Sequence, residues 1–310
     1  MRETIILMKD AFRQISEKKI ITPLRTNIDI SKHNAGALFM PAYSEESDLL
    51  SLKLVTVFKD NPKIKLPLIH ALVVLMDGAT GEPLAIIDGE YLTALRTGAG
   101  SGLATDLLAR ENATTLGIFG AGIQGRAQMD AVCEVRDIQE IKIFDKNPEA
   151  ANSLAQTAQN EHHIDAGIDT DGSQISYCDI ICTATTSSTP LFYDIDLKNG
   201  VHLNAIGAYQ ADKREIPGET IKRSKVVVDQ RSACLEEAGD LIIPIKEKVI
   251  NENHIYAELG EIVAGQKSGR SNESEITVFK SVGNAAQDLL TAGEIFKKAQ
   301  NRGIGTSVSL

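Results

Sequence analysis

The residues with the clearest chemical potential form a glycine-rich run between an apolar stretch and an amphipathic one. Periodicity predicts a strand over residues 115–119 and a helix over residues 123–135. The glycine-rich run connects this strand to this helix and includes the first residues of the helix. It consists of Gly120, Ala121, Gly122, Ile123, Gln124 and Gly125. In this context GxGxxG is the phosphate-binding fingerprint of a dinucleotide-binding domain, whereas the same letters in isolation would prove little.

Each glycine of the run has a physical reason to be glycine. Gly120 permits the tight turn, Gly122 lets the backbone approach the pyrophosphate, and Gly125 permits close packing of helix on strand. The amides at the start of the helix then donate hydrogen bonds to the phosphates. We therefore expect these three glycines, together with Ile123 and Gln124, to bind the cofactor.

A carboxylate stands where the next strand, over residues 141–144, is expected to end. Asp145 follows Gly125 by 20 residues, a spacing at which a carboxylate accepts hydrogen bonds from the adenosine ribose hydroxyls and repels a 2′-phosphate. NAD is therefore the expected cofactor, with NADP possible because Lys146 is adjacent. The alternative interpretation of Asp145 is a solvated turn residue.

Hydroxyl side chains follow a further apolar strand, predicted over residues 179–184. Thr183 and Thr185 lie at its carboxyl end, where parallel sheets bind their ligands, so we expect them to contact the cofactor. An ordinary surface turn is an equally good interpretation of the hydroxyl-rich residues 187–189.

Three separated cations in the first third of the chain suggest an anion site. Arg25, Lys53 and Arg96 each adjoin apolar or strand-like sequence and do not belong to a charge run, which indicates anion binding in a cleft. By spacing alone, surface salt bridges are the more frequent explanation.

Two patterns of secondary structure must position these groups. The first part of the chain has an amphipathic helix over residues 5–15, extended segments over 36–40, 51–57 and 68–76, a hairpin to 83–87, and a helix over 91–108. Beyond residue 112, strands and helices alternate, with further buried strands at 202–206, 225–228 and 276–279. A last helix covers residues 285–301 and ends before Gly303.

Composition excludes several classes of function. The 310 residues carry a formal net charge of −10, which disfavours binding to nucleic acid. No run reaches the about 20 apolar residues that cross a bilayer, and the first residues are amphipathic and unlike a signal peptide, so we expect no membrane contact and a cytoplasmic protein. The four cysteines have no histidine cluster near them, so we expect reduced thiols and no metal site.

At this point the sequence resembles the ornithine cyclodeaminase and mu-crystallin family over nearly its whole length. The resemblance lies in residues 39–41, 52–55, 81–84, 95–99, 120–125, 204–207 and 277–283, which read FMP, LKLV, GEPL, LRTGA, GAGIQG, NAIG and TVFKSVG. Relatives usually have a strand before the first helix, and we expect none here.

The resemblance implies a discontinuous fold. A doubly wound parallel Rossmann sheet, residues 113–284, is inserted in an α+β substrate-binding and dimerisation domain, residues 1–112 plus 285–310, whose sheet is mostly antiparallel. The family forms homodimers through that first domain. By the same likeness Arg25, Lys53 and Arg96 hold the substrate carboxylate, and Thr97 and Val282 lie at the cofactor.

The family contains several activities, which two positions help to separate. By this resemblance, the cyclodeaminases of the family have a Glu-Leu-Met-Pro segment and a Gly-Gly-Asp segment, whose carboxylates interact with the distal amine of ornithine. Leu38 and Tyr209 stand at those positions here. Burying an ammonium without its carboxylates would cost several kcal/mol, so ornithine cyclodeamination is disfavoured, and Tyr209 also counts against alanine dehydrogenase.

We therefore expect reduction of a small cyclic imino acid, such as pyrroline-2-carboxylate, or oxidation of the matching amino acid. Lys53 or Asp212 could supply the proton; the alternatives are a structural ion pair for Lys53 and a loop-capping carboxylate for Asp212. Ornithine cyclodeaminase and alanine dehydrogenase remain the other enzymatic hypotheses. A crystallin-like protein that binds NAD(P) without turnover is the non-enzymatic one.

Overall fold

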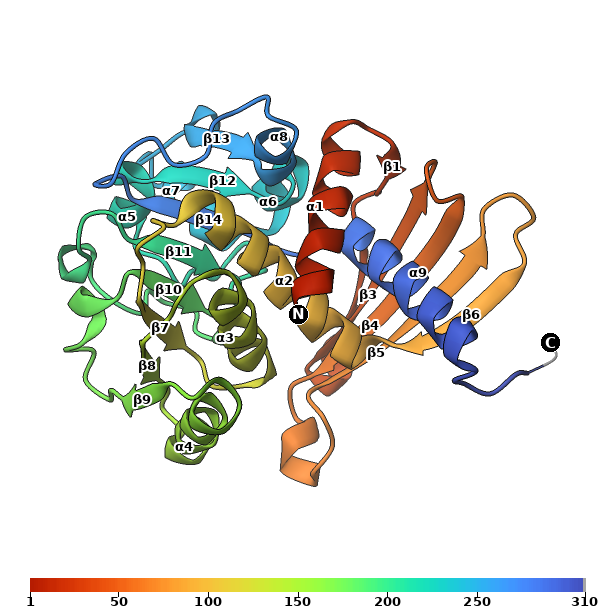
Figure 1. Ribbon diagram of the computed structural model, residues 1–310, viewed down its shortest axis with the longest axis horizontal. Helices are drawn as coiled ribbons and strands as arrows, with labels where there is room; N and C mark the ends of the chain where they lie inside the picture. The colour runs from red at the N-terminus through yellow and green to blue at the C-terminus, as the bar shows by residue number, and fades with distance from the viewer. Residues whose placement is uncertain (309–310) are drawn as a thin grey trace. The chain divides into compact units, whose positions relative to one another are not determined.

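The fold of this chain is given by a computed structural model, which describes residues 1–308 (Figure 1). The chain divides into two compact units, each made of two segments. Unit 1 contains Met1–Lys9 and Thr97–Gly283, and unit 2 contains Asp10–Arg96 and the described residues from Asn284 onward. The sequence-based limits are 1–112 plus 285–310 for one domain and 113–284 for the other. They assign residues 1–9, 97–112 and 284 differently from these units and stay a prediction.

Unit 1 is built on an eight-stranded parallel sheet in the order β13-β12-β14-β11-β10-β7-β8-β9. Its strands are β7 (Thr115–Phe119), β8 (Glu140–Phe144), β9 (Asp165–Ile168), β10 (Ile180–Thr183), β11 (His202–Ala205), β12 (Lys225–Val228), β13 (Ile255–Glu258) and β14 (Thr277–Lys280). The order changes direction between β7 and β10, the kind of position where such sheets bind ligands.

Both faces of this sheet are buried, which explains the continuous apolar runs of its strands. Ile118 and Ile143 belong to one core cluster, which also contains Met129 and Val132 of α3. Phe119 and Phe144, the next residues along the same strands, belong to a second cluster on the other face, and their rings stack at 4.2 Å. Strands buried on both faces are a property of parallel sheets covered by helices.

The helices of unit 1 connect these strands. They are α3 (Ile123–Val135), α4 (Pro148–Thr157), α5 (Gly218–Arg223), α6 (Arg231–Glu237), α7 (Gly239–Lys246) and α8 (Leu259–Val263). Two longer helices, α1 (Arg2–Ser16) and α2 (Gly89–Leu108), have residues in both units, because the divisions fall after Lys9 and after Arg96.

Unit 2 is built on a six-stranded antiparallel sheet in which β2 pairs with β3 and the remaining order is β1-β3-β4-β5-β6. The strands are β1 (Ile20–Ile21), β2 (Thr26–Ile30), β3 (Ala35–Ser44), β4 (Leu49–Phe58), β5 (Ile69–Asp77) and β6 (Pro83–Asp88). Helix α9 (Ala285–Arg302) contacts β3, β4 and β5 and lies across the sheet in Figure 1.

Alternation in the central strands separates a buried face from an accessible one. On β4, Ser51, Lys53 and Val55 are buried, whereas Leu52 between them is 37% exposed. On β5, Val73 and Leu75 are fully buried, whereas Leu72 is 49% exposed. Since side chains of a strand point alternately to opposite faces, Lys53 lies on the face that α9 covers.

The structure confirms the predicted fold class, with one doubly wound parallel sheet and one mostly antiparallel sheet. The longer predicted segments all correspond to observed elements, from the first helix to α9. Strands β1, β2, β9 and β13 were not expected: β1 has two residues, β2 and β9 are mostly exposed, and β13 is buried only at alternate residues. None of them carries the continuous buried run of β10, β11 or β14.

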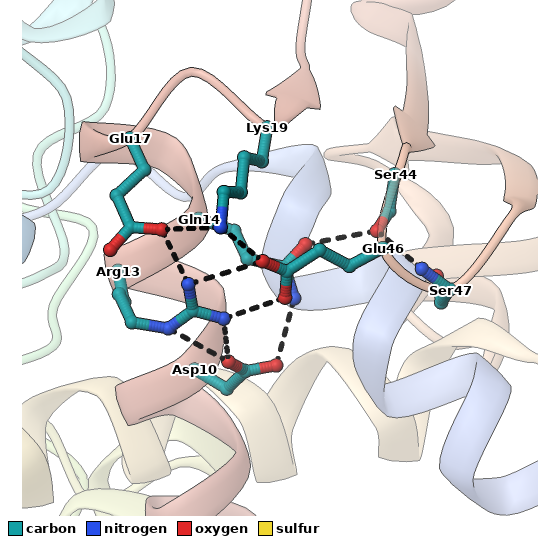
Figure 2. Close-up of polar contacts among 8 residues, drawn as sticks. All are labelled: Asp10, Arg13, Gln14, Glu17, Lys19, Ser44, Glu46 and Ser47. Atoms are coloured by element: carbon teal, nitrogen blue, oxygen red, sulfur yellow. Dashed lines mark hydrogen bonds and ion pairs between the residues drawn. The ribbon is translucent and has the colours of Figure 1, made fainter.

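A network of charged side chains joins the end of α1 to the turn between β3 and β4 within unit 2 (Figure 2). The Arg13 guanidinium donates to Asp10 at 2.6 Å and to Glu46 at 2.7 Å, and Lys19 lies 2.7 Å from Glu46 and 3.0 Å from Glu17. Hydrogen bonds from Arg13 and then Lys19 lower the pKa of Glu46 to about 2. The turn is therefore fastened to the helix by ionised groups.

We predict that Glu46→Gln removes a pH-dependent part of the stability. The folded pKa of Glu46 lies below its ordinary value of 4.5, so its charge stabilises the fold above about pH 4.5 and less as the pH falls toward 2. Urea unfolding of both proteins across this range should show a difference that is largest near neutral pH and vanishes in acid. Glu45→Gln changes the same charge in the same turn and serves as control; an equal effect there would contradict the prediction.

Candidate active site

The glycine-rich run forms the connection from β7 to α3. Gly120 adopts φ +96°, which strongly favours glycine, and a Cβ on Gly125 would lie 1.9 Å from the carbonyl oxygen of Gly120. Gly122 is the N-cap of α3 and provides no side-chain acceptor for the first amides of the helix. A Cβ at Gly122 would meet nothing within 4 Å. Open space in front of unfilled amide donors fits a dinucleotide pyrophosphate.

Asp145 lies directly after β8, beside this turn. Its Oδ2 accepts a hydrogen bond from the amide of Ala121 at 2.6 Å, and its Oδ1 accepts one from Asn147 at 2.7 Å. The carboxylate is thus held against the glycine-rich turn by backbone groups. This position suits hydrogen bonding to a ribose beside the pyrophosphate.

Thr183 and Thr185 both donate their hydroxyl hydrogens to one buried carboxylate, that of Glu215. The distances are 2.9 Å from Thr183 and 2.6 Å from Thr185, and the amides of Thr185 and Ala208 donate at 2.7 and 3.1 Å. Their hydroxyl oxygens can therefore act toward a ligand as acceptors only. Glu215 joins the connections that follow β10 and β11, and the sequence analysis did not assign it a role.

Glu215 belongs to a cluster of ionisable groups without solvent exposure. Asp240 accepts hydrogen bonds from the amides of Glu215 and Ile216, and pairs with Lys280 Nζ at 2.8 Å. Burial, followed by the charge of Asp240, raises the pKa of Glu215. The cluster connects the carboxyl ends of β10, β11 and β14.

The two remaining predicted cofactor residues also lie in unit 1. Val282 is 7% exposed, and its amide donates to Asp229 at 3.0 Å, beside a bond from Gly283 to the same oxygen. Thr97 is 7% exposed on α2. Asp229, directly after β12, thus holds the segment after β14 that contains Val282 through two backbone hydrogen bonds.

The three predicted cations lie in unit 2, where a carboxylate joins two of them. Lys53 and Arg96 are 1% and 5% exposed. Asp288 of α9, which is fully buried, lies 2.7 Å from Lys53 Nζ and accepts a hydrogen bond from Arg96 Nε at 2.9 Å. Sequence reasoning did not single out Asp288, because no local pattern relates it to residues of β4 and α2.

Lys53 has unusual acid–base properties. Burial, followed by the positive charges of Arg96 and Arg25, lowers its pKa to about 7, and Asp288 opposes these effects. The action of Arg25 on Lys53 places all three predicted cations in one electrostatic environment. A lysine that titrates near neutral pH can both hold an anion and release a proton.

The residues proposed to distinguish substrates occupy different units. On β3, Met40 pairs with Lys53, so Leu38 two residues earlier lies on the same face as Lys53. Tyr209, 37% exposed, and the exposed Asp212 follow β11 in unit 1. Lys53 is thus buried, whereas Asp212 is exposed.

Among residues 1–308, no helix is long and apolar enough to span a membrane, and no group of three His, Cys, Asp or Glu suits a metal ion. Cys133, Cys178, Cys182 and Cys234 are free thiols. Burial raises the pKa of Cys133, Cys178 and Cys182 to about 12, which makes these three poor nucleophiles.

Comparison with known proteins agrees with this geometry. Residues 1–303 match the model of the ornithine cyclodeaminase/mu-crystallin family. A Δ1-pyrroline-2-carboxylate reductase of Bacillus cereus is 42% identical over 310 residues, covering 99% of this chain and 95% of that protein.

Two solved structures are similar over the whole chain. Thermococcus litoralis Δ1-pyrroline-2-carboxylate reductase in complex with NADH and L-proline has a TM-score of 0.97 at 43% identity, with 99% of this chain and 96% of that chain covered. An archaeal alanine dehydrogenase dimer with bound NAD has a TM-score of 0.95 at 32% identity, with coverages of 100% and 95%.

We predict that alanine substitutions at two glycines of the run fail for different reasons. Gly125→Ala places Cβ against backbone and should destabilise the fold by about 1–3 kcal/mol. Gly122→Ala has room in the protein and should leave the melting temperature unchanged, but it should weaken NADH binding at least about tenfold, or 1.4 kcal/mol. Thermal melts and NADH fluorescence titrations measure both. Normal NADH affinity in Gly122→Ala would count against pyrophosphate binding at this turn.

Proposed function

Because the chain belongs to the ornithine cyclodeaminase/mu-crystallin family, as its motifs predict, we propose that it is an NAD-dependent reductase of a small cyclic imino acid. Δ1-Pyrroline-2-carboxylate is the expected substrate and L-proline the product. The observation that carries this function is the buried pair of Lys53 and Arg96 on one carboxylate. The similar reductases, at 42% and 43% identity, support the same activity.

The substrate carboxylate binds to Lys53, Arg96 and Arg25. Two buried cations, Lys53 and Arg96, share the single carboxylate of Asp288, so the three side chains together carry excess positive charge. The carboxylate of the substrate neutralises this charge. The planar guanidinium of Arg96 suits a carboxylate because it donates two parallel hydrogen bonds.

Leu38 favours an imino acid over ornithine. Its side chain lies on the face of the sheet that carries Lys53 and offers no acceptor to the distal ammonium of ornithine. Burial of that cation without a partner would cost several kcal/mol, whereas ring methylenes gain from an apolar neighbour. Cyclodeamination is therefore the weaker alternative.

The residues of this chain contribute mainly positioning and proton control. Bound NADH supplies the hydride, which adds to the carbon of the C=N bond. Holding the carboxylate fixes that carbon and makes the transfer effectively intramolecular. Lys53, with a pKa of about 7, is matched to keep or deliver the proton on nitrogen at neutral pH. The buried Lys53 is preferred to the exposed Asp212 for this role.

The cofactor is held by unit 1. The amides from Ile123 to Gly125 at the start of α3 donate to the pyrophosphate, Asp145 binds the adenosine ribose, and Thr97, Thr183, Thr185 and Val282 line the remaining cofactor path. The ribose contact of Asp145 makes NADH the preferred cofactor over NADPH.

We predict that the purified protein oxidises NADH when Δ1-pyrroline-2-carboxylate or its six-membered homologue is added. Arg96→Met should lower kcat/KM about 100-fold, chiefly through KM, whereas Arg223→Met, on an exposed ion pair with Asp194, should leave it unchanged. NADH absorbance follows the reaction, beside an ammonia assay with ornithine. Ammonia release at constant absorbance would identify a cyclodeaminase; tight NADH binding without any turnover would identify a binding protein.

We further propose that the chain forms a homodimer through the accessible face of the unit 2 sheet. Leu52, Val74 and Ile86 are paired in one row across β4, β5 and β6, and Leu72 is paired with Leu54 in the next. Ile86 is 70% exposed and Leu72 is 49% exposed. A continuous apolar sheet face of this kind indicates a protein interface, and the similar alanine dehydrogenase is a dimer.

We predict that Leu72→Glu converts the dimer to monomer, because a charge on the apolar face must be desolvated for the second copy to bind. Light scattering coupled to size exclusion gives the mass of each form. Ile195→Glu changes a residue that is 90% exposed outside the sheet and should remain dimeric. A monomeric wild-type protein, or a dimeric Leu72→Glu, would contradict the interface.

A cytoplasmic location is also proposed. Cys178, Cys182 and Cys234 are buried free thiols, a state that the reducing cytoplasm preserves. NADH as the reductant agrees with that compartment.

A further inference from the structure

Asp288 links two cations that the proposed reaction uses. Its Oδ1 accepts from Arg96 Nε at 2.9 Å, and its Oδ2 lies 2.7 Å from Lys53 Nζ. The side chain of Asp288 has no solvent exposure, and those of Lys53 and Arg96 have 2% and 6%. One carboxylate therefore sets the separation and orientation of both cations, which come from α2 and β4.

The first turn of α9 is built to hold this carboxylate in place. The side chain of Asn284 caps the helix by accepting from Ala286 N at 2.8 Å, and Gln287 Oε1 accepts from the amide of Asn284 at 3.1 Å. The same Gln287 oxygen accepts from Arg96 Nη1 at 3.2 Å. Two consecutive residues of α9, Gln287 and Asp288, thus accept hydrogen bonds from Nη1 and Nε of Arg96.

The charge of Asp288 also decides which form of Lys53 is present. Burial, then the positive charges of Arg96 of α2 and Arg25 before β2, lowers the pKa of Lys53, and Asp288 of α9, 2.7 Å from its Nζ, raises it. Either role of Lys53, carboxylate binding or proton donation, requires the ammonium form. Without Asp288, burial beside two guanidinium groups would leave Lys53 neutral at physiological pH.

We propose that Asp288 is a positioning residue of the imine reduction, which holds Arg96 and the ammonium of Lys53 in the arrangement that binds the substrate carboxylate. The inference rests on the proposed function and extends it to a residue on α9. Asp288 acts through Lys53 and Arg96, whose ammonium and guanidinium groups it contacts directly.

The test compares Asp288→Asn with wild type in two independent measurements. The first follows the ε-carbon NMR resonance of Lys53, identified by its loss in Lys53→Met, as the pH is varied. Its titration midpoint, near 7 in the wild type, should fall by at least about one pH unit in Asp288→Asn, because a neutral amide no longer favours the ammonium. This readout does not depend on turnover.

The second measurement is the pH profile of kcat/KM with NADH and Δ1-pyrroline-2-carboxylate. The alkaline limb should move to lower pH in Asp288→Asn, and kcat/KM at neutral pH should fall about 100-fold. Asp288→Glu, which restores the charge, should recover part of the loss and move the limb back. NADH affinity should stay unchanged, since the glycine-rich turn lies in unit 1, and this affinity also reports that the variant is folded.

Thr291→Val is the matched control. Thr291 is buried on the same helix at 2% exposure, and its replacement should alter neither the Lys53 titration nor the pH profile. An unchanged Lys53 titration in Asp288→Asn overturns the inference even where the wild type reduces the imine. If the Lys53 titration shifts in Asp288→Asn but the wild type does not reduce the imine, the proposed function is overturned. A role for Asp288 in that reaction is then overturned with it.

Discussion

The ion pairs of Asp288 with Lys53 and Arg96 are the interactions on which unit 2 depends. Two buried cations require a buried carboxylate, because an unpaired charge in an apolar interior costs several kcal/mol. That carboxylate comes from α9, 192 residues after Arg96 in the chain. The return of the C-terminal helix to the sheet therefore completes both the core and the charge balance of the unit, and it explains why unit 2 is discontinuous.

Unit 1 depends on a different constraint, the close approach of two backbone segments in the connection from β7 to α3. Gly125 packs against Gly120 so tightly that no Cβ is tolerated, while Gly122 faces open space. Buried acceptors then hold the neighbouring strand ends: Glu215 fixes the connections after β10 and β11, and Asp229 fixes the segment after β14. Such preorganisation limits the reorganisation that binding requires.

Local patterns were sufficient to predict most of the fold. The central strands β3, β4 and β5, the alternation around β7, α3 and β8, and the end of α9 before Gly303 carry strong periodicity or capping signals. Strands β1, β2, β9 and β13 escaped prediction, and the division inside α2, after Arg96, lies within one continuous helical pattern. A boundary of that kind is defined by packing between distant segments and leaves no mark on the local sequence.

The sequence by itself predicted a dinucleotide-binding turn, proposed Asp145 as its ribose carboxylate and, through its family motifs, singled out the cations Arg25, Lys53 and Arg96, because each lies in a recognisable local context. Tertiary structure alone decided which carboxylates form ion pairs or hydrogen bonds with the residues of these sites. Asp288 meets Lys53 and Arg96, and Glu215 meets Thr183 and Thr185, only when distant segments pack together. The pKa of Lys53, about 7, likewise depends on burial and on neighbours far away in the chain, since desolvation and charge act through space and not along the sequence.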